Sequence, residues 1–164
     1  MDLHGNQISC LPESFGQLTA LQYVWLDGND LSWLPGSFGE LSALRVLNLQ
    51  GNQLTCLPDG ICHLAGLEFL YLQDNELSWL PESVGEMAAL EELCLAKNEL
   101  SWLPESFGQL TALRNLWLQE NHLSRLPASF GQLVALEFLN VQGNELSCLR
   151  EGFGQHSALQ VLQL

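Results

Sequence analysis

Asparagine recurs along this chain at a fixed spacing of 23 residues, with no insertion or slip. Around each Asn the apolar residues keep their places, with Leu or Val three residues before it, Ile or Leu two after it and Leu five after it. The seven positions are Asn6, Asn29, Asn52, Asn75, Asn98, Asn121 and Asn144. Self-similarity at a period of roughly 20 to 50 residues is the signature of a repeat architecture. We therefore expect a stack of similar units.

Each unit predicts one short strand followed by a tight return. The stretch LWLQE at residues 116–120 alternates apolar and polar residues, which is the period of a strand with one buried face. The following LPxxFGxL stretch is too short, and too interrupted by Pro and Gly, for a long helix, so it predicts helical turns or 3-10 structure. One unit cannot bury its leucines alone, so neighbouring strands should lie parallel, about 5 Å apart, in one sheet. The repeated Asn is expected to be a buried amide that bonds backbone groups at the turn.

The repeating unit, LxxLxLxxNxLxxLPxxFGxL, resembles the repeat of the leucine-rich repeat family over essentially the whole chain. Its length and its LPxxFGxL half look most like the intracellular repeats of Ras-group, Roco and Scribble-type proteins. The resemblance implies an α/β repeat solenoid, a right-handed curved horseshoe segment with a parallel concave β-sheet and short helical or 3-10 turns on the convex side. We expect a single domain over residues 1–164, with seven 23-residue repeats, a terminal strand and no evident caps.

The two ends of the repeat array are apolar. Met1 stands at an apolar strand position, and Leu162 and Leu164 complete the last strand. Repeat arrays normally carry polar caps over the terminal core. Two interpretations follow: the chain is a fragment of a longer protein, or its exposed solenoid ends meet other copies in a homo-oligomer.

The composition and charge of the chain indicate which classes of partner to expect and in which cellular compartment the protein acts. The formal net charge is −14, and binding of nucleic acid or of an anionic membrane surface requires clustered Lys and Arg. No apolar run spans a bilayer and no signal peptide precedes the repeats, which favours a cytoplasmic location. Cys10 and Cys56 occupy one column two units apart, about 10 Å by strand spacing. A disulfide needs Cα atoms within about 7 Å, so free thiols are predicted.

The sequence contains no motif of an enzyme. It has no GxSxG, P-loop, GxGxxG or HExxH pattern, and its four His residues do not share a column. We therefore expect no catalytic residues, no metal site and no cofactor.

Aromatic residues mark the expected concave face. Residues six and four before each Asn share one side of the strand and should project from the sheet. We predict a partner-binding surface made of Tyr23, Trp25, Phe69, Tyr71, Glu92, Trp117 and Phe138. Large exposed aromatics are enriched at protein interfaces, and the resemblance implies a partner on this face. The alternative is that they only stack across strands for stability.

Two further surfaces are predicted. One edge of the concave face should be acidic, through Asp74, Glu76, Glu99 and Glu120. It favours a protein or peptide partner with a basic patch, although the acidity alternatively serves only solubility. A secondary flank, four residues after the Asn, comprises Trp33, Trp79, Trp102 and Arg125. There Trp79 can stack on Trp102 and Arg125 can lie over Trp102 as a cation–π partner, for structure or for a second contact.

The favoured function is therefore a non-catalytic protein–protein interaction module that binds a protein or peptide partner on its concave face. Two alternatives stay open. One is a structural or self-assembly unit that associates through uncapped ends or the Trp flank. The other is a recruitment domain of a larger signalling protein.

Overall fold

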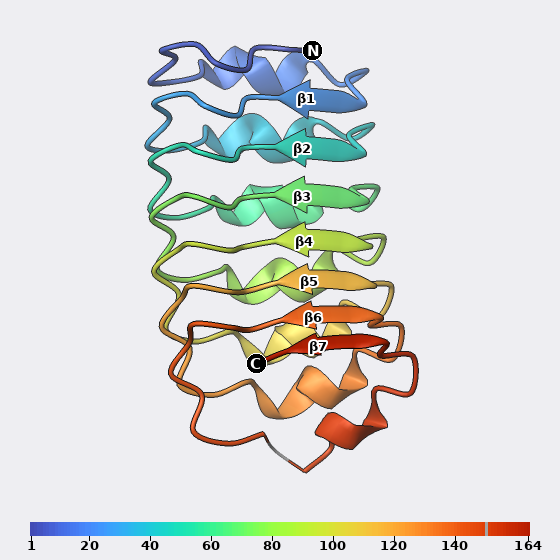
Figure 1. Ribbon diagram of the computed structural model, residues 1–164. Helices are drawn as coiled ribbons and strands as arrows, with labels where there is room; N and C mark the ends of the chain where they lie inside the picture. The colour runs from blue at the N-terminus through green and yellow to red at the C-terminus, as the bar shows by residue number, and fades with distance from the viewer. Residues whose placement is uncertain (150) are drawn as a thin grey trace.

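The computed structural model describes residues 1–149 and 151–164, and within them seven strands form one parallel sheet in the order of the chain (Figure 1). Each strand is three residues long. The strands are β1 (Tyr23–Trp25), β2 (Val46–Asn48), β3 (Phe69–Tyr71), β4 (Glu92–Cys94), β5 (Asn115–Trp117), β6 (Phe138–Asn140) and β7 (Val161–Gln163). This confirms the predicted repeat solenoid.

The return segments are all 3-10 helices, on the far side of the sheet in the view of Figure 1. They are η1 (Glu13–Gln17), η2 (Gly36–Glu40), η3 (Asp59–His63), η4 (Glu82–Glu86), η5 (Glu105–Gln109), η6 (Ala128–Gln132) and η7 (Phe153–Gln155). The first six each begin directly after a proline, whose fixed φ prepares the turn. The 3-10 turn proposed for the LPxxFGxL stretch is confirmed.

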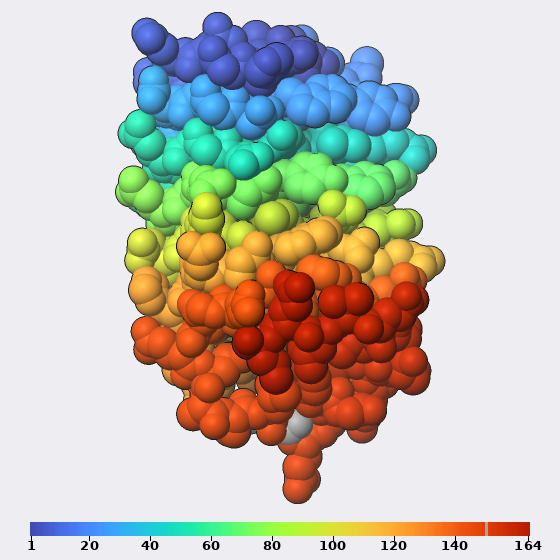
Figure 2. All heavy atoms as spheres, viewed as in Figure 1, coloured from blue at the N-terminus to red at the C-terminus, as the bar shows by residue number. Residues whose placement is uncertain are grey.

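The sheet register equals the sequence period. Tyr23 pairs with Val46, and Val46 pairs with Phe69, so each residue lies beside its equivalent 23 positions later. A column of equivalent residues in the sequence is thus a row across the strands in the structure. The units stack as successive bands across the face shown in Figure 2.

The repeated asparagines form a buried ladder. Asn98 illustrates it: its Oδ1 accepts the backbone N–H of Leu77 at 2.9 Å, and its Nδ2 donates to the carbonyls of Leu72 at 3.0 Å and Leu95 at 3.1 Å. From Asn29 to Asn144 each amide satisfies backbone groups of two neighbouring units, whereas the exposed amide of Asn6 bonds only Leu3 and His4 of its own unit. The predicted structural role of these residues is confirmed.

The core is one cluster, mainly of leucines and phenylalanines, between the sheet and the 3-10 helices. Glycine allows the 3-10 helices to approach one another. A Cβ on Gly108 in η5 would collide with the carbonyl oxygen of Ser129 in η6. Neighbouring units therefore pack backbone against backbone on this side.

The five cysteines are free, as predicted. Cys10 and Cys148 are exposed, whereas Cys62 is buried and burial raises the pKa of its thiol. Across residues 1–149 and 151–164, no helix has the length and apolar character needed to cross a membrane. Those residues also contain no group of three or more His, Cys, Asp or Glu side chains placed to hold a metal ion.

Candidate functional site

The exposed face of the sheet carries aromatic side chains on β1, β3, β5 and β6. The row four residues before each Asn contains Trp25, Asn48, Tyr71, Cys94, Trp117, Asn140 and Gln163, one from each strand from β1 to β7. We call Trp25, Tyr71 and Trp117 the aromatic row. Because parallel strands lie about 4.8 Å apart, successive members begin about 9.6 Å apart.

Two of these rings make aromatic pairs. Trp25 stacks on Tyr23 of the same strand, with ring centroids 5.9 Å apart and an interplanar angle of 15°. Trp117 packs against Phe138 of β6, with centroids 5.1 Å apart and a tilt of 37°. Tyr23 and Trp25 still expose 45% and 37% of their surface, so pairing leaves apolar area open to water.

The third ring is fixed by a polar contact. The Tyr71 hydroxyl donates to Oε1 of Glu92 at 3.0 Å, from β3 to β4. Burial and the Glu92 carboxylate raise the pKa of Tyr71 to about 12, so the phenol remains a donor at neutral pH. Phe69 lies on the same strand and is half-buried. The structure thus brings all seven predicted face residues onto one side of the sheet.

The residues between the aromatic strands bend toward the backbone. Asn48 accepts the N–H of Gln50 through Oδ1 at 3.0 Å, and Asn140 accepts that of Gln142 at 3.0 Å. Cys94 is half-buried, and burial raises the pKa of its thiol. The two gaps in the aromatic row, on β2 and β4, therefore hold the small side chains of Asn48 and Cys94, and the amide oxygen of Asn48 is already bonded to the backbone.

Three charged residues on one edge of the sheet have left-handed backbone conformations. Asp74, Lys97 and Glu120 have φ values of 55°, 54° and 56°. They stand one residue before the Asn, where the other units place Gly5, Gly28, Gly51 and Gly143. A residue with a Cβ is disfavoured there by about 1 to 2 kcal/mol. Lys97 Nζ lies 3.6 Å from Oδ1 of Asp74.

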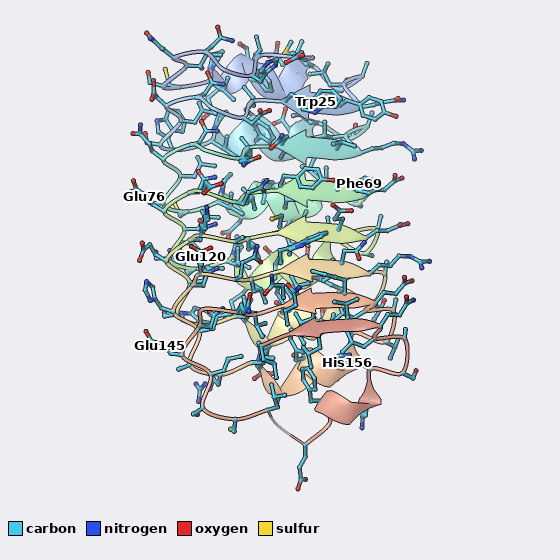
Figure 3. All side chains as sticks on the ribbon, in the orientation of Figure 1. Trp25, Phe69, Glu76, Glu120, Glu145 and His156 are labelled. Atoms are coloured by element: carbon cyan, nitrogen blue, oxygen red, sulfur yellow. The ribbon has the colours of Figure 1, made fainter. Side chains whose placement is uncertain are left out.

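The rest of this edge is also charged. Nε2 of His122 lies 3.0 Å from Oε2 of Glu99, and its Nδ1 lies 3.5 Å from Oε1 of Glu145. These side chains and Glu120 line a shallow hollow. Figure 3 shows Glu76, Glu120 and Glu145 along this edge, with Trp25 and Phe69 over the strands. All four predicted acidic-edge residues are exposed and lie in this region.

The flank differs from its prediction. Trp33, Trp79 and Trp102 are exposed by 46%, 40% and 40%, but no ring contact joins Trp79 to Trp102 within the described chain. Arg125 and Trp102 both line a hollow that also contains Glu82, but within the described chain they form no cation–π pair. The predicted stacking and cation–π pair are therefore wrong, because the rings point to water.

Some features of the site were not predicted. The left-handed conformation of Asp74, Lys97 and Glu120 was missed, although the Gly residues of that column in other units are its sequence signal. Three side-chain oxygens two residues before the Asn are also buried and lack a hydrogen-bond partner among residues 1–149 and 151–164. They belong to Asp27, Gln73 and Gln119. No sequence signal predicts these three buried oxygens, since the burial of a single side-chain atom depends on how the surrounding side chains pack.

A stack of parallel strands with one leucine-filled face and one exposed face defines a solenoid repeat protein. A family model described as "Leucine-rich repeat region" matches residues 1–101, and one described as "Leucine Rich Repeat" matches residues 112–133. The chain belongs to the leucine-rich repeat family. No curated protein sequence matches it. The subfamily resemblance to Ras-group, Roco and Scribble-type proteins stays a prediction.

Solved structures agree with this assignment. A leucine-rich repeat protein of Leptospira interrogans is 36% identical, with a TM-score of 0.96 over 99% of this chain and 42% of the other. The leucine-rich repeat ectodomain of the Arabidopsis thaliana receptor kinase GASSHO1/SCHENGEN3 is 25% identical, with a TM-score of 0.84 over 98% and 20%. A Listeria monocytogenes internalin, 22% identical with a TM-score of 0.81 over 99% and 47%, shows the shared fold alone. The chain spans less than half the length of these proteins.

Proposed function

We infer that this chain is a non-catalytic protein-binding module that holds a protein or peptide partner across the aromatic row and the acidic edge. Leucine-rich repeat domains commonly mediate protein–protein interaction, and the Arabidopsis ectodomain was solved in complex with CASPARIAN STRIP INTEGRITY FACTOR 2. The inference for this chain rests on its own surface. Its free cysteines favour action in a reducing compartment such as the cytoplasm.

One observation carries the proposal: charged residues occupy strained positions where this chain elsewhere uses glycine. Asp74, Lys97 and Glu120 fall in three consecutive units, and all are exposed. A purely structural array would be more stable with Gly at these positions, since Gly adopts this conformation without steric cost. Strain of this kind collects at functional sites, where the side chain is needed for contact.

The neighbouring apolar surface supports the same function. Tyr23 and Trp25 are large rings that remain exposed although a stacked pair is already formed. Trp and Tyr bury much area at low entropic cost and are enriched at interface hot spots. The aromatic row and the acidic edge together therefore form a surface with an apolar centre and a charged rim, as protein interfaces have.

The charge of the rim selects the partner. Among the described residues, Lys97 and His122 are the basic side chains that line the acidic hollow, and Lys97 already faces Asp74. The net charge of −14 repels nucleic acid and anionic membranes, so the proposed partner is a protein or peptide with a basic patch beside an apolar one.

The test compares partner binding with stability in two variants. One replaces Asp74, Lys97 and Glu120 by Gly; the other replaces Trp117 by Ala. Partners captured from a reducing lysate are identified, and the affinity of each purified partner is measured for both variants and for Trp33→Ala, a flank control. We expect the Gly variant to unfold at higher urea concentration yet bind about tenfold more weakly.

Trp117→Ala should weaken binding by a similar factor, whereas Trp33→Ala should leave it unchanged. Unchanged binding in both face variants would contradict the proposal. A loss of binding in Trp33→Ala alone would move the interface to the flank of Trp33, Trp79 and Trp102.

A further inference from the structure

From β1 to β5 the aromatic row repeats every two strands, although the fold repeats every strand, and on β6 the ring of Phe138 beside Trp117 ends this alternation. Rings stand on β1, β3 and β5, and small side chains stand between them on β2 and β4. On the edge, acidic Asp74 and Glu120 follow β3 and β5 and basic Lys97 follows β4, whereas Gly28 and Gly51 follow β1 and β2. The three rings, and the two carboxylates beside the last two of them, are therefore spaced about 9.6 Å apart for a ligand that runs across the strands.

The spacing of about 9.6 Å can be compared with the distance at which side chains recur on one face of a bound peptide in each regular conformation. A polyproline II helix has three residues per turn and rises about 9.3 Å per turn, which matches the row to within about 1 Å over its two intervals. A β-strand places side chains of one face about 6.8 Å apart and falls out of step at the second ring. An α-helix repeats its face at about 10.5 Å over seven residues, which accumulates about 2 Å of error over the same distance.

The unused hydrogen-bond donors favour the same conformation. The indole N–H groups of Trp25 and Trp117 donate to no residue within 1–149 and 151–164. A polyproline II helix makes no internal hydrogen bonds, so its carbonyl groups are available as acceptors. The carbonyl groups of an α-helix are already bonded within the helix. Aromatic-lined grooves recognise polyproline II segments in this way in other folds.

The acidic edge favours a basic side chain in the turns of the bound peptide that lie beside it. Asp74 follows Tyr71 by three residues, and Glu120 follows Trp117 by three. When one turn of the peptide packs beside Tyr71 or Trp117, another side chain of the same turn can therefore point toward the carboxylate of Asp74 or Glu120. Glu120 makes no ion pair with any described residue. Asp74 has Lys97 Nζ at 3.6 Å from Oδ1 and accepts a hydrogen bond from Gln50 Nε2 at 3.2 Å through Oδ2, and both partners are polar side chains at the surface. A cation at every third ligand position would be complementary to this edge.

We propose that the partner segment is a proline-rich peptide in the polyproline II conformation, with Lys or Arg at every third residue, that lies across β1 to β5. This rests on the proposed function and narrows it to one class of ligand. Each turn contacts one ring of the aromatic row, and the cations of the turns at Tyr71 and Trp117 face Asp74 and Glu120. Seven residues span the row from Trp25 to Trp117, because six steps of about 3.1 Å cover the roughly 19 Å between them.

The test uses three synthetic peptides of equal charge, titrated calorimetrically against the whole chain. The first contains four Pro-Pro-Arg triplets. The second has the same composition with its arginines grouped at one end, which keeps the conformation and removes the period. The third is an Ala-rich helical peptide with the same number of arginines. We expect the triplet peptide to bind about tenfold more tightly than either control.

Variants then locate the bound peptide. Trp117→Ala and Glu120→Gln should each remove most of the advantage of the triplet peptide, and Trp33→Ala should keep it. Equal affinity for all three peptides, or no binding of any of them, would overturn the inference. Tighter binding of the helical peptide that still depends on Trp117 would overturn it too, while leaving the proposed function intact. The proposed function is contradicted by a different result, namely captured partners that bind the Gly variant and Trp117→Ala as tightly as the unaltered chain.

Discussion

Tyr71 on β3 holds Glu92 on β4 through a hydroxyl-to-carboxylate hydrogen bond of 3.0 Å. This contact joins two neighbouring strands on the exposed face, and both side chains belong to the proposed binding surface. Since the ring of Tyr71 is fixed before any ligand arrives, less side-chain entropy is lost on binding.

Burial of the Tyr71 phenol, together with its contact to Glu92, makes the stability of the fold fall at alkaline pH. The pKa of Tyr71 rises from 10.0 to about 12, so the folded state binds its proton more tightly than the unfolded state. The associated stability is complete below pH 10 and is lost as the pH rises toward 12. Phenolate absorbance in a Tyr23→Phe background should report the raised pKa. Adding Glu92→Gln should lower it, and an unchanged value would show that Glu92 makes no contribution.

Removal of one rung of the asparagine ladder should be costly. Asn98→Ala leaves the Leu77 N–H without a partner. The carbonyls of Leu72 and Leu95 each lose one of two amide donors and keep those of Asn75 and Asn121. We expect a loss of about 1 to 3 kcal/mol in urea unfolding, because the Leu77 N–H is buried. The control is Asn6→Ala in the exposed first unit, which should cost about 1 kcal/mol or less. Equal losses would mean that the ladder does not depend on burial.

The close approach of the 3-10 helices predicts a clash. Gly108→Ala places a Cβ against the Ser129 carbonyl, so η5 and η6 must separate. We expect a destabilisation of about 1 to 3 kcal/mol. Gly36→Ala meets no atom within 4 Å and should be neutral or stabilising by up to about 1 kcal/mol. Similar thermal shifts in both variants would contradict the packing argument.

The buried His156 should be a weak point of the core. Its Nδ1 contacts the Leu133 carbonyl at 3.0 Å, but its Nε2 has no partner within the described chain. Five equivalent units place Leu there and one places Met. Leu133 keeps the N–H of Leu136 at 3.1 Å in either case. We expect His156→Leu to stabilise the fold by about 1 kcal/mol, since it removes a buried unpaired nitrogen.

The control for this variant is His63→Leu at an exposed position in η3, which should change stability by less than about 0.5 kcal/mol. A decrease in stability for His156→Leu would show that the contact with Leu133 outweighs the unpaired nitrogen.

The sequence predicted the features that recur in every repeat. Buried and exposed side chains alternate along a strand, so the position of a residue in the repeat predicts its side of the sheet. The leucine rows, the Asn ladder and the side of the sheet that carries Tyr71 and Trp117 all follow from spacing. Side-chain direction does not follow from spacing. The stacking of Trp79 on Trp102 was therefore predicted wrongly, and the diagonal bond from Tyr71 to Glu92 was not predicted. Backbone strain at Lys97 was visible only by comparison with Gly in the other units.

The 23-residue register has a consequence for how such a chain can change length. Removal of one interior unit would join two equivalent leucine-lined surfaces, so the fold would survive as a shorter array. Removal of the unit that carries β2, β3 or β4 would disrupt the aromatic row, because two rings or two small side chains would then be adjacent. Within β1 to β5, excision or duplication of two adjacent units keeps the rings on alternate strands. The fold can therefore gain or lose single repeats, whereas the aromatic row is preserved only when repeats are gained or lost in pairs.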